Sequence, residues 1–189
     1  MFNLLILIKM FASVKWGENE KGISVDGIRG HVSFYQQSPE EDVRVYVDIK
    51  GLPEGLHGFH IHEKKLEDTE GDVMDCCDKL GGHFNVGEKW SPENQSGTPH
   101  GQNGHNGDLC NNIYSDGELC EKMFLDSKIS LFPEDERNVV GRSIVIHENP
   151  DDLGLPDYQD QKKNIDKLIT GNAGKRIACG NIELENDEE

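Results

Sequence analysis

Between Val43 and Lys50 the sequence alternates strictly between aliphatic side chains and longer polar ones. Successive side chains of a β-strand point to opposite faces, so the four aliphatic residues of this run would face a core and the other four would face solvent. Shorter runs rich in β-forming residues occur at 31–35, 128–132 and 143–147. The sequence therefore predicts several short strands, most of them buried on one face.

Turn-forming residues separate these runs, and no segment carries a sustained helical stripe. A chain of 189 residues is long enough to bury the core of one domain. Many short strands joined by turns favour an all-β protein, folded as an antiparallel β-sandwich or barrel. Loops that are long for a compact domain usually serve a function, and three polar stretches of this kind lie at 63–82, 87–107 and 149–174.

The formal net charge of −17 argues against two classes of partner. Nucleic acid and anionic membrane surfaces would both be repelled, and no apolar stretch reaches the roughly 20 residues needed to span a bilayer. The apolar segment 2–8 is followed by the positive charge of Lys9, whereas a secretory leader carries its positive charge first. We therefore expect a cytoplasmic protein, with secretion or export as the alternative if this segment is a leader.

Seven of the eight histidines lie between Leu56 and His147. His60 and His62 are two residues apart, so on a strand both imidazoles would leave the same face and could bind one ion. Imidazole nitrogen suits both copper and zinc, and a carboxylate is an acceptable zinc ligand. Any one of these histidines could be an ordinary surface residue or the partner of a buried group. Their clustering favours a two-metal site made from His60, His62, His83, His100, His105, Asp108 and His147.

Five motifs, in order along the chain, resemble those of the copper/zinc superoxide dismutases. The resemblance runs from about Ala12 to Leu184, and it implies a Greek-key antiparallel β-sandwich or barrel, immunoglobulin-like, with long metal-binding and electrostatic loops. It divides the chain into a short apolar extension (1–11), the dismutase domain (12–184) and an acidic tail (185–189). The motifs are Gly55-Leu56-His57-Gly58-Phe59-His60-Ile61-His62-Glu63, Gly82-His83-Phe84-Asn85, His105-Asn106-Gly107-Asp108-Leu109, Val145-Ile146-His147-Glu148 with Asp151-Asp152-Leu153-Gly154, and Thr170-Gly171-Asn172-Ala173-Gly174-Lys175-Arg176-Ile177-Ala178-Cys179-Gly180.

The same resemblance implies one copper ion and one zinc ion per chain, bridged by His83. Asp151 would link a copper ligand, His60, to a zinc ligand, His100, and so orient both rings. His57 matches a histidine that is structural in the family. The implied copper ligands are His60, His62, His83 and His147, and the implied zinc ligands are His83, His100, His105 and Asp108.

The spacing around His100 departs from the family pattern. His83 to His100 spans 17 positions (100 − 83), longer than usual, and His100 to His105 spans five (105 − 100), shorter than usual. The assignment of His100 rests on the glycine that follows it and on the absence of another nearby histidine.

Arg176 matches the arginine that attracts the anionic substrate beside the copper. Thr170 would form the opposite wall of the channel, and Lys167 is one of the basic residues that would give the channel a positive field in an acidic chain.

Two of the five cysteines match a disulfide of the family. The resemblance pairs Cys77 with Cys179, and Cys76 is a neighbouring competitor for that bond. Buried free thiols are the alternative. Cys110 and Cys120 have no counterpart in the family, so they could pair across a hairpin or stay reduced.

The activity implied is the conversion of superoxide to dioxygen and hydrogen peroxide, an antioxidant reaction that cycles copper between its (II) and (I) states while zinc is structural. Two other readings are a metal-binding or copper-delivery domain without activity, and a sandwich used for adhesion or assembly. A homodimer is possible, but Asn181 and Glu183 stand where the family has small or apolar contact residues. A carboxylate in a desolvated contact is costly unless it is paired, so the usual dimer contact is in doubt.

Overall fold

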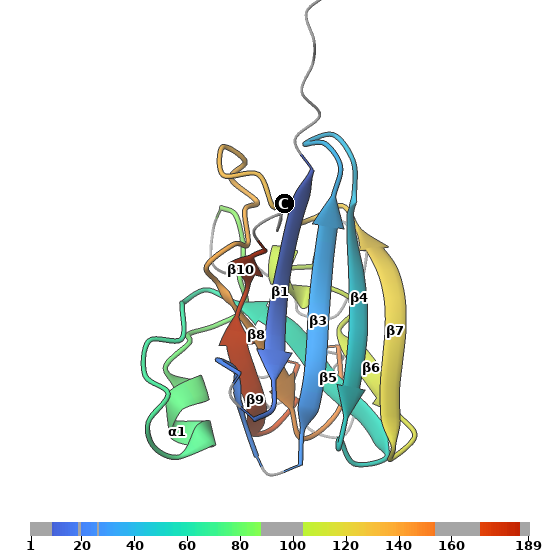
Figure 1. Ribbon diagram of the computed structural model, residues 1–189, viewed down its shortest axis with the longest axis vertical. Coiled ribbons are helices and arrows are strands. Elements are labelled where there is room, and N and C mark those ends of the chain that lie inside the picture. The colour runs from blue at the N-terminus through green and yellow to red at the C-terminus, as the bar shows by residue number, and fades with distance from the viewer. Residues whose placement is uncertain (1–8, 19, 26, 88–103, 154–170, 186–189) are drawn as a thin grey trace, which may run out of the picture.

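Two five-stranded antiparallel sheets form the protein (Figure 1). The computed structural model describes residues 9–18, 20–25, 27–87, 104–153 and 171–185, and the strand count of each sheet refers to these residues alone. The first sheet has the spatial order β10 (Glu183–Leu184), β1 (Met10–Trp16), β3 (Arg29–Gln36), β4 (Val43–Lys50), β7 (Leu119–Asp126). The second has the order β2 (Ile23–Ser24), β9 (Arg176–Asn181), β8 (Ser143–His147), β5 (Gly55–His62), β6 (Asn112–Ser115).

The strictly alternating run forms β4, with the bounds that the sequence predicted. Its four aliphatic side chains are fully buried, and they pack in one core with inward-facing residues of the second sheet such as Phe59 and Ile144. The predicted strands at 31–35 and 143–147 correspond to β3 and β8. The prediction of an all-β antiparallel sandwich is therefore confirmed.

The connections between strands follow a Greek-key pattern. After β4 the chain crosses to the second sheet to form β5 and β6, and it then returns as β7 to pair with β4. Gly51, at the predicted turn after β4, has φ 83°, and its Cβ would lie 2.0 Å from the carbonyl oxygen of Gly27. Only glycine fits this close crossing of two loops.

The run 128–132 was predicted as a strand, and that prediction was wrong. Ser130 forms only an isolated bridge with Asn138, within a loop that turns back after Phe132. Ile129 and Leu131 are nevertheless buried in the core. The β-forming residues of this run reflect burial of loop side chains, and burial alone does not supply a neighbouring strand.

The long segment 63–82 contains a short helix, α1 (Val73–Asp78), that the sequence analysis did not predict. Asp72 caps it, because its carboxylate accepts hydrogen bonds from the backbone N–H groups of Met74 and Asp75. The capping aspartate was the available signal, but six residues are too few to show a helical stripe.

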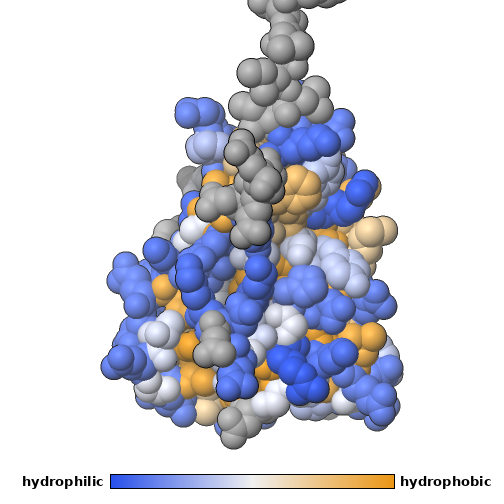
Figure 2. Space-filling model, in the orientation of Figure 1, coloured by the Kyte–Doolittle hydropathy of each residue, from blue (hydrophilic) through white to orange (hydrophobic). Residues whose placement is uncertain are grey.

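The outer face of the first sheet is the one seen in Figure 2, where hydrophilic residues predominate and hydrophobic ones lie among them. Met123 and Leu125 on β7 are the most exposed of the large hydrophobic residues near its edge. Among the described residues, no helix has the length and apolarity that crossing a membrane would need.

Candidate metal centre

Strand β5 supplies two imidazoles to the outer side of the second sheet. Phe59 and Ile61 point into the core, so the alternating residues His60 and His62 point the other way. Both histidines are nevertheless almost completely buried, at 0% and 1% exposure. Loops therefore cover this face of the sheet and create an enclosed polar site outside the apolar core.

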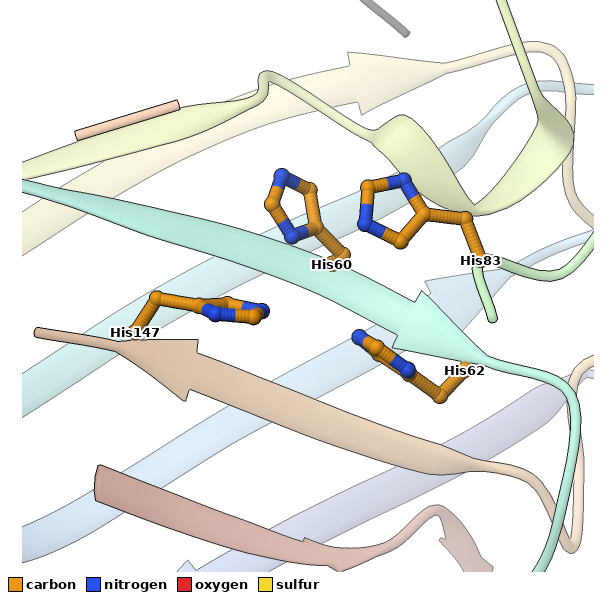
Figure 3. A group of neighbouring side chains, drawn as sticks. All are labelled: His60, His62, His83 and His147. Atoms are coloured by element: carbon orange, nitrogen blue, oxygen red, sulfur yellow. The ribbon is translucent and has the colours of Figure 1, made fainter. Parts of the chain in front are cut away.

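Two further imidazoles converge on the same place (Figure 3). His147 ends β8, which is the neighbour of β5 in the sheet. His83 follows the segment 63–82 and forms an isolated β-bridge with His62. One nitrogen from each of the four rings lies within 4.8 Å of the others. The sequence analysis predicted that these four histidines come together, and they do.

Backbone carbonyls fix the orientation of two of these rings. The Nδ1 of His62 donates to the carbonyl oxygen of Gly81 at 2.9 Å, and the Nδ1 of His147 donates to that of Gly174 at 3.2 Å. A carbonyl can only accept, so the proton of each neutral ring sits on Nδ1 and the Nε2 lone pair is left bare. Each ring thus presents a ligand atom toward the centre.

Five buried imidazole nitrogens of these histidines have no hydrogen-bond partner among the described residues, an arrangement that is costly for the protein alone. Burial, together with the neighbouring positive charges, also lowers the pKa of His60, His62 and His147 well below 6.5, so these rings are neutral at pH 7. Neutral imidazoles with bare lone pairs are suited to bind a copper ion or another soft-to-borderline cation. Four of these atoms, His60 Nδ1, His62 Nε2, His83 Nε2 and His147 Nε2, are left for a cation, whereas the fifth, His60 Nε2, lies against Asp151.

His83 belongs to a second group with His105 and Asp108, all of them buried. Oδ1 of Asp108 lies 2.7 Å from Nδ1 of His83 and 3.2 Å from Nδ1 of His105. Burial alone would raise the pKa of the Asp108 carboxyl, but hydrogen bonds from His105 and His83 outweigh it and hold the pKa far below its usual range. Two imidazoles and an ionised carboxylate are ligands that zinc accepts. His83 therefore presents one nitrogen to each group.

A close contact positions the second group against β5. Asp108 ends a 3-10 helix, Asn106–Asp108, whose Gly107 donates its N–H to the carbonyl of Phe84 at 2.7 Å. A Cβ on Gly107 would lie 2.2 Å from the carbonyl oxygen of Ile61. The absence of a side chain at this residue lets the helix lie directly on β5, next to His60 and His62.

Asp151 lies against His60, with Oδ2 2.9 Å from Nε2, so an ionised carboxylate faces a neutral imidazole. The Asn112 side chain holds the backbone of Asp151 by accepting from its N–H and donating to its carbonyl. The carboxylate engages one nitrogen of His60 and leaves Nδ1 for the centre.

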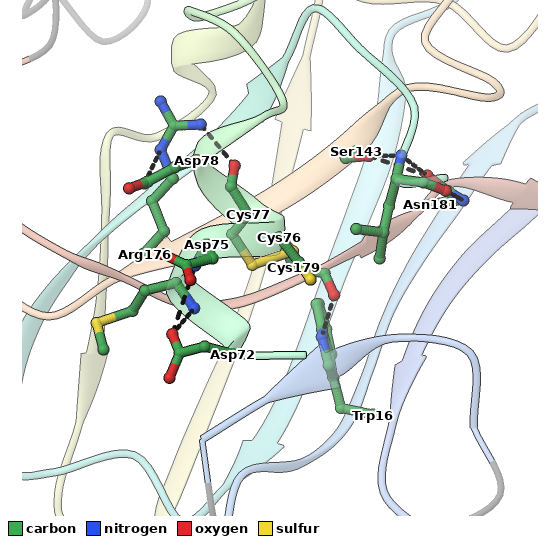
Figure 4. The surroundings of a disulfide bond; sticks show 12 residues. Trp16, Asp72, Asp75, Cys76, Cys77, Asp78, Ser143, Arg176, Cys179 and Asn181 are labelled. Carbon is green, nitrogen blue, oxygen red and sulfur yellow. Dashed lines mark hydrogen bonds and ion pairs between the residues drawn. A yellow bond between two sulfur atoms is a disulfide. The ribbon is translucent and has the colours of Figure 1, made fainter. Parts of the chain in front are cut away.

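Arg176, at the start of β9, lies at the edge of the centre. Its Nη1 and Nη2 donate to the carbonyls of Cys77 and Gly81, each at 2.8 Å. The disulfide between Cys77 and Cys179 joins residues 102 apart in sequence, and it ties α1 to β9 (Figure 4). This confirms the pairing that the sequence analysis expected.

The other three cysteines are free thiols. Cys76 is buried, and its thiol donates to the carbonyl of Glu70 across 3.7 Å. Burial raises the pKa of Cys120 to about 11, so this thiol is a poor nucleophile. The sequence analysis left open whether Cys110 and Cys120 form a disulfide or stay reduced, and in the structure both are reduced.

Three residues that the sequence analysis assigned to the site, His100, Lys167 and Thr170, lie outside the described residues. His57 lies between the carbonyls of His147 and Pro53, at 2.9 and 3.0 Å, and holds β5 to β8 near the centre. Two other contacts were missed. Asp78 on α1 forms an ion pair with Arg176, and the Asn181 side chain bonds to both backbone groups of Leu66. Neither contact joins residues close in sequence, so no local pattern signals it.

A family model and several curated proteins match this chain. The model described as copper/zinc superoxide dismutase matches residues 28–182. "Superoxide dismutase (Cu-Zn) 5" of Dictyostelium discoideum is 38% identical over 162 residues, covering 86% of this chain and 94% of the relative. "Superoxide dismutase (Cu-Zn) A" of Xenopus laevis is 40% identical over 156 residues, covering 82% and 89%.

"Extracellular superoxide dismutase (Cu-Zn)" of Drosophila melanogaster is 37% identical over 158 residues, covering 84% of this chain and 77% of the relative. Among solved structures, the clock protein EA4 superposes with a TM-score of 0.67 at 33% identity. That comparison covers 97% of this chain and 99% of the other. The similarity therefore includes the whole sandwich and both ligand groups.

Proposed function

The chain belongs to the copper/zinc superoxide dismutase family, and from this premise we propose which of its residues hold the metals and handle the substrate. Its activity is the oxidoreductase reaction in which two superoxide anions and two protons give dioxygen and hydrogen peroxide, a reaction that protects against oxidative damage.

The two ligand groups divide between the two metals. Copper would be held by the nitrogens of the buried centre that face no other group. These are Nδ1 of His60 and Nε2 of His62, His83 and His147. The proposed zinc ligands are Nδ1 of His83 together with His105 and Asp108. His100 would be the fourth ligand, which the family resemblance implies. When bound, copper supplies one-electron oxidation and reduction, whereas zinc has one oxidation state and keeps its ligands in place. We propose one ion of each kind per chain.

His83 would also handle a proton. The reaction consumes two protons, and the four histidines are almost completely buried, so a proton donor inside the centre is needed. Asp108 engages Nδ1, so Nε2 is the atom at which this ring can hold a proton and give it to the reduced substrate. Asp151 orients His60 so that the neighbouring ring keeps its position during this exchange.

Arg176 would attract and orient the substrate. Its guanidinium is fixed by two loop carbonyls, and its positive charge is among the groups that lower the pKa of His60, His62 and His147. Lys167 and Thr170 would complete the channel. A local positive field at the entrance explains how an acidic chain captures an anion.

The sharing of His83 between two groups of buried ligand atoms is the observation that carries this proposal. The experiment measures superoxide decay and metal content together, using copper- and zinc-loaded protein. We expect His147→Ala to abolish activity and reduce copper content while zinc content is unchanged. His31→Ala is the matched control, since His31 lies on β3 away from both groups and should change neither. Loss of zinc in His147→Ala, or full activity without copper, would contradict the assignment.

The C-terminal strand supports a finer proposal about oligomerisation. Glu183 pairs with Lys21 at 2.6 Å, Glu185 pairs with Lys15 at 2.9 Å, and β10 closes onto β1. These charges are paired within one chain and would need to lose water in a contact between copies. We therefore propose that a homodimer, if formed, does not use this face, and light scattering of the loaded protein with Glu183→Gln as the test variant checks this.

We also propose that the protein acts in the cytoplasm. Support comes from the order of the apolar segment and Lys9, although segment 2–8 lies outside the described residues and one relative is named extracellular. N-terminal sequencing of the protein recovered from its source cells, inside and in the medium, would test this. A start beyond residue 8 in exported material would overturn it.

A further inference from the structure

Helix α1 places a carboxylate beside the arginine that we assign to substrate capture. Oδ1 of Asp78 lies 3.6 Å from Nε of Arg176. The two terminal nitrogens of the same guanidinium are engaged by the carbonyls of Cys77 and Gly81. Figure 4 shows Asp78 on one side of the guanidinium and the carbonyl of Cys77 on another. An acidic side chain is thus built into the surroundings of a residue whose assigned task is to attract an anion.

The backbone that carries Asp78 is held in place from two sides. The preceding residue, Cys77, forms the disulfide with Cys179 on β9, and its carbonyl accepts from Arg176 itself. Lys79 caps the end of α1. Asp78 therefore stays within reach of the guanidinium as long as the disulfide is intact, and only its side chain can move away.

The two partners differ in their contact with solvent. The Asp78 side chain is 69% exposed, whereas that of Arg176 is 16% exposed. A largely exposed carboxylate forms a weak ion pair, because water screens it and its side chain loses freedom when it pairs. A small anion arriving at the channel can therefore displace Asp78, but it must compete with it for the same positive charge.

Other carboxylates on the helix have a different relation to the arginine. Asp72 caps the first turn, and Asp75 lies one turn before Asp78. Among the charged groups of the described residues, Asp78 is the one that forms an ion pair with Arg176, and it alone opposes the burial that lowers the pKa of this guanidinium. Asp75 has the same charge on the same helix without that pair, and so it offers a matched control.

We propose that Asp78 is a positioning residue that competes with superoxide and other small anions for Arg176 and thereby limits the rate at which the enzyme captures its substrate. This proposal rests on the proposed role of Arg176 as the anion-attracting residue. Removing the charge frees the guanidinium for the substrate and makes the channel entrance more positive. Both effects raise the rate of capture.

The first test measures the second-order rate of superoxide decay with metal-loaded enzyme. At low ionic strength we expect Asp78→Asn to be roughly two- to fivefold faster than the wild type, the gain expected for removing one charge several ångströms from an incoming anion. The gain should shrink as salt shortens the Debye length to about 8 Å near 0.15 M. Asp78→Glu should restore the wild-type rate, and Asp75→Asn should have a smaller effect.

The second test does not depend on activity. In zinc-loaded, copper-free protein labelled with ¹⁵N, the Nε–H resonance of Arg176 should shift in Asp78→Asn, return in Asp78→Glu and stay unchanged in Asp75→Asn. An unchanged resonance in Asp78→Asn would overturn the ion pair. Equal rates for Asp78→Asn and Asp75→Asn in an active enzyme would overturn this proposal alone. A wild-type protein that does not consume superoxide would overturn the proposed function as well.

Discussion

The imidazole of His60 and the carboxylate of Asp151 face each other inside the protein, with Nε2 2.9 Å from Oδ2 and both side chains fully enclosed. Asp151 is close to a tight turn as well, since a Cβ on Gly171 would lie within 2.1 Å of its carboxylate oxygens. Gly171 therefore packs against the carboxylate on one side, and the ring of His60 faces it on the other. Its role is to decide which nitrogen of His60 faces the centre.

This relationship predicts the effect of Asp151→Asn. The amide keeps the shape but loses the charge that favours a proton on Nε2 of His60, so the ring no longer reliably presents Nδ1. We expect the affinity for copper to fall by roughly 10- to 100-fold, as is typical when the outer partner of a ligating histidine is lost. Competition with a copper chelator measures this. Glu148→Gln is the control, because Glu148 is exposed, and an equal loss there would contradict the prediction.

Gly107→Ala should weaken the zinc group. The added Cβ would meet the carbonyl oxygen of Ile61 at 2.2 Å, so the 3-10 helix must move away from β5 and take Asp108 with it. We expect a loss of about 1–3 kcal/mol of stability, the usual cost of overpacking, together with weaker zinc binding in a zinc titration. Gly82→Ala is the matched control, since nothing lies within 4 Å of its Cβ. Unchanged zinc affinity in Gly107→Ala would show that the helix can relax without moving its ligand.

The metal-free protein should lose stability as the pH falls through the histidine range. Burial lowers the pKa of His60, His62 and His147 well below 6.5 in the folded state. Above about pH 6.5 these rings are neutral in both states; below it, the unfolded chain takes up protons that the folded chain cannot. The free energy of unfolding therefore decreases as the pH falls from about 6.5.

Urea unfolding in the presence of a metal chelator, between about pH 7.5 and 5.5, measures this dependence. His147→Gln removes one of the three titrating rings, so its stability should depend on pH more weakly than that of the wild type. A free energy of unfolding that stays constant over this range would mean that the buried rings take up protons in the folded state.

Loss of the disulfide should affect both stability and substrate capture. The bond between Cys77 and Cys179 joins residues 102 apart in sequence, so Cys179→Ser should lower the free energy of unfolding by about 2–5 kcal/mol. The activity of the loaded enzyme should also fall, because Arg176 is held by carbonyls of the same loop. Cys110→Ser, which changes a free thiol, should have the smaller effect on unfolding. Equal losses in the two variants would contradict this prediction.

Local patterns in the sequence determined much of the fold. The residues of β4 alternate between core and surface, and this regularity depends only on strand geometry, so the bounds of β4 could be predicted. The same geometry put His60 and His62 on one face. The family motifs then identified His83, His147 and the pair His105 and Asp108, which lie in three separate segments of the sequence. The run 128–132 shows the limit of such patterns, because burial without a partner strand left it a loop.

The tertiary structure alone decided which atoms of these residues meet and what surrounds them. The tautomers of His62 and His147 depend on the carbonyls of Gly81 and Gly174, and no sequence pattern links those residues. The ion pair between Asp78 and Arg176 likewise joins two elements brought together by a disulfide. A sequence specifies the kinds of side chain and their local periodicity, whereas a pKa, a tautomer or an ion pair depends on distances across the folded chain.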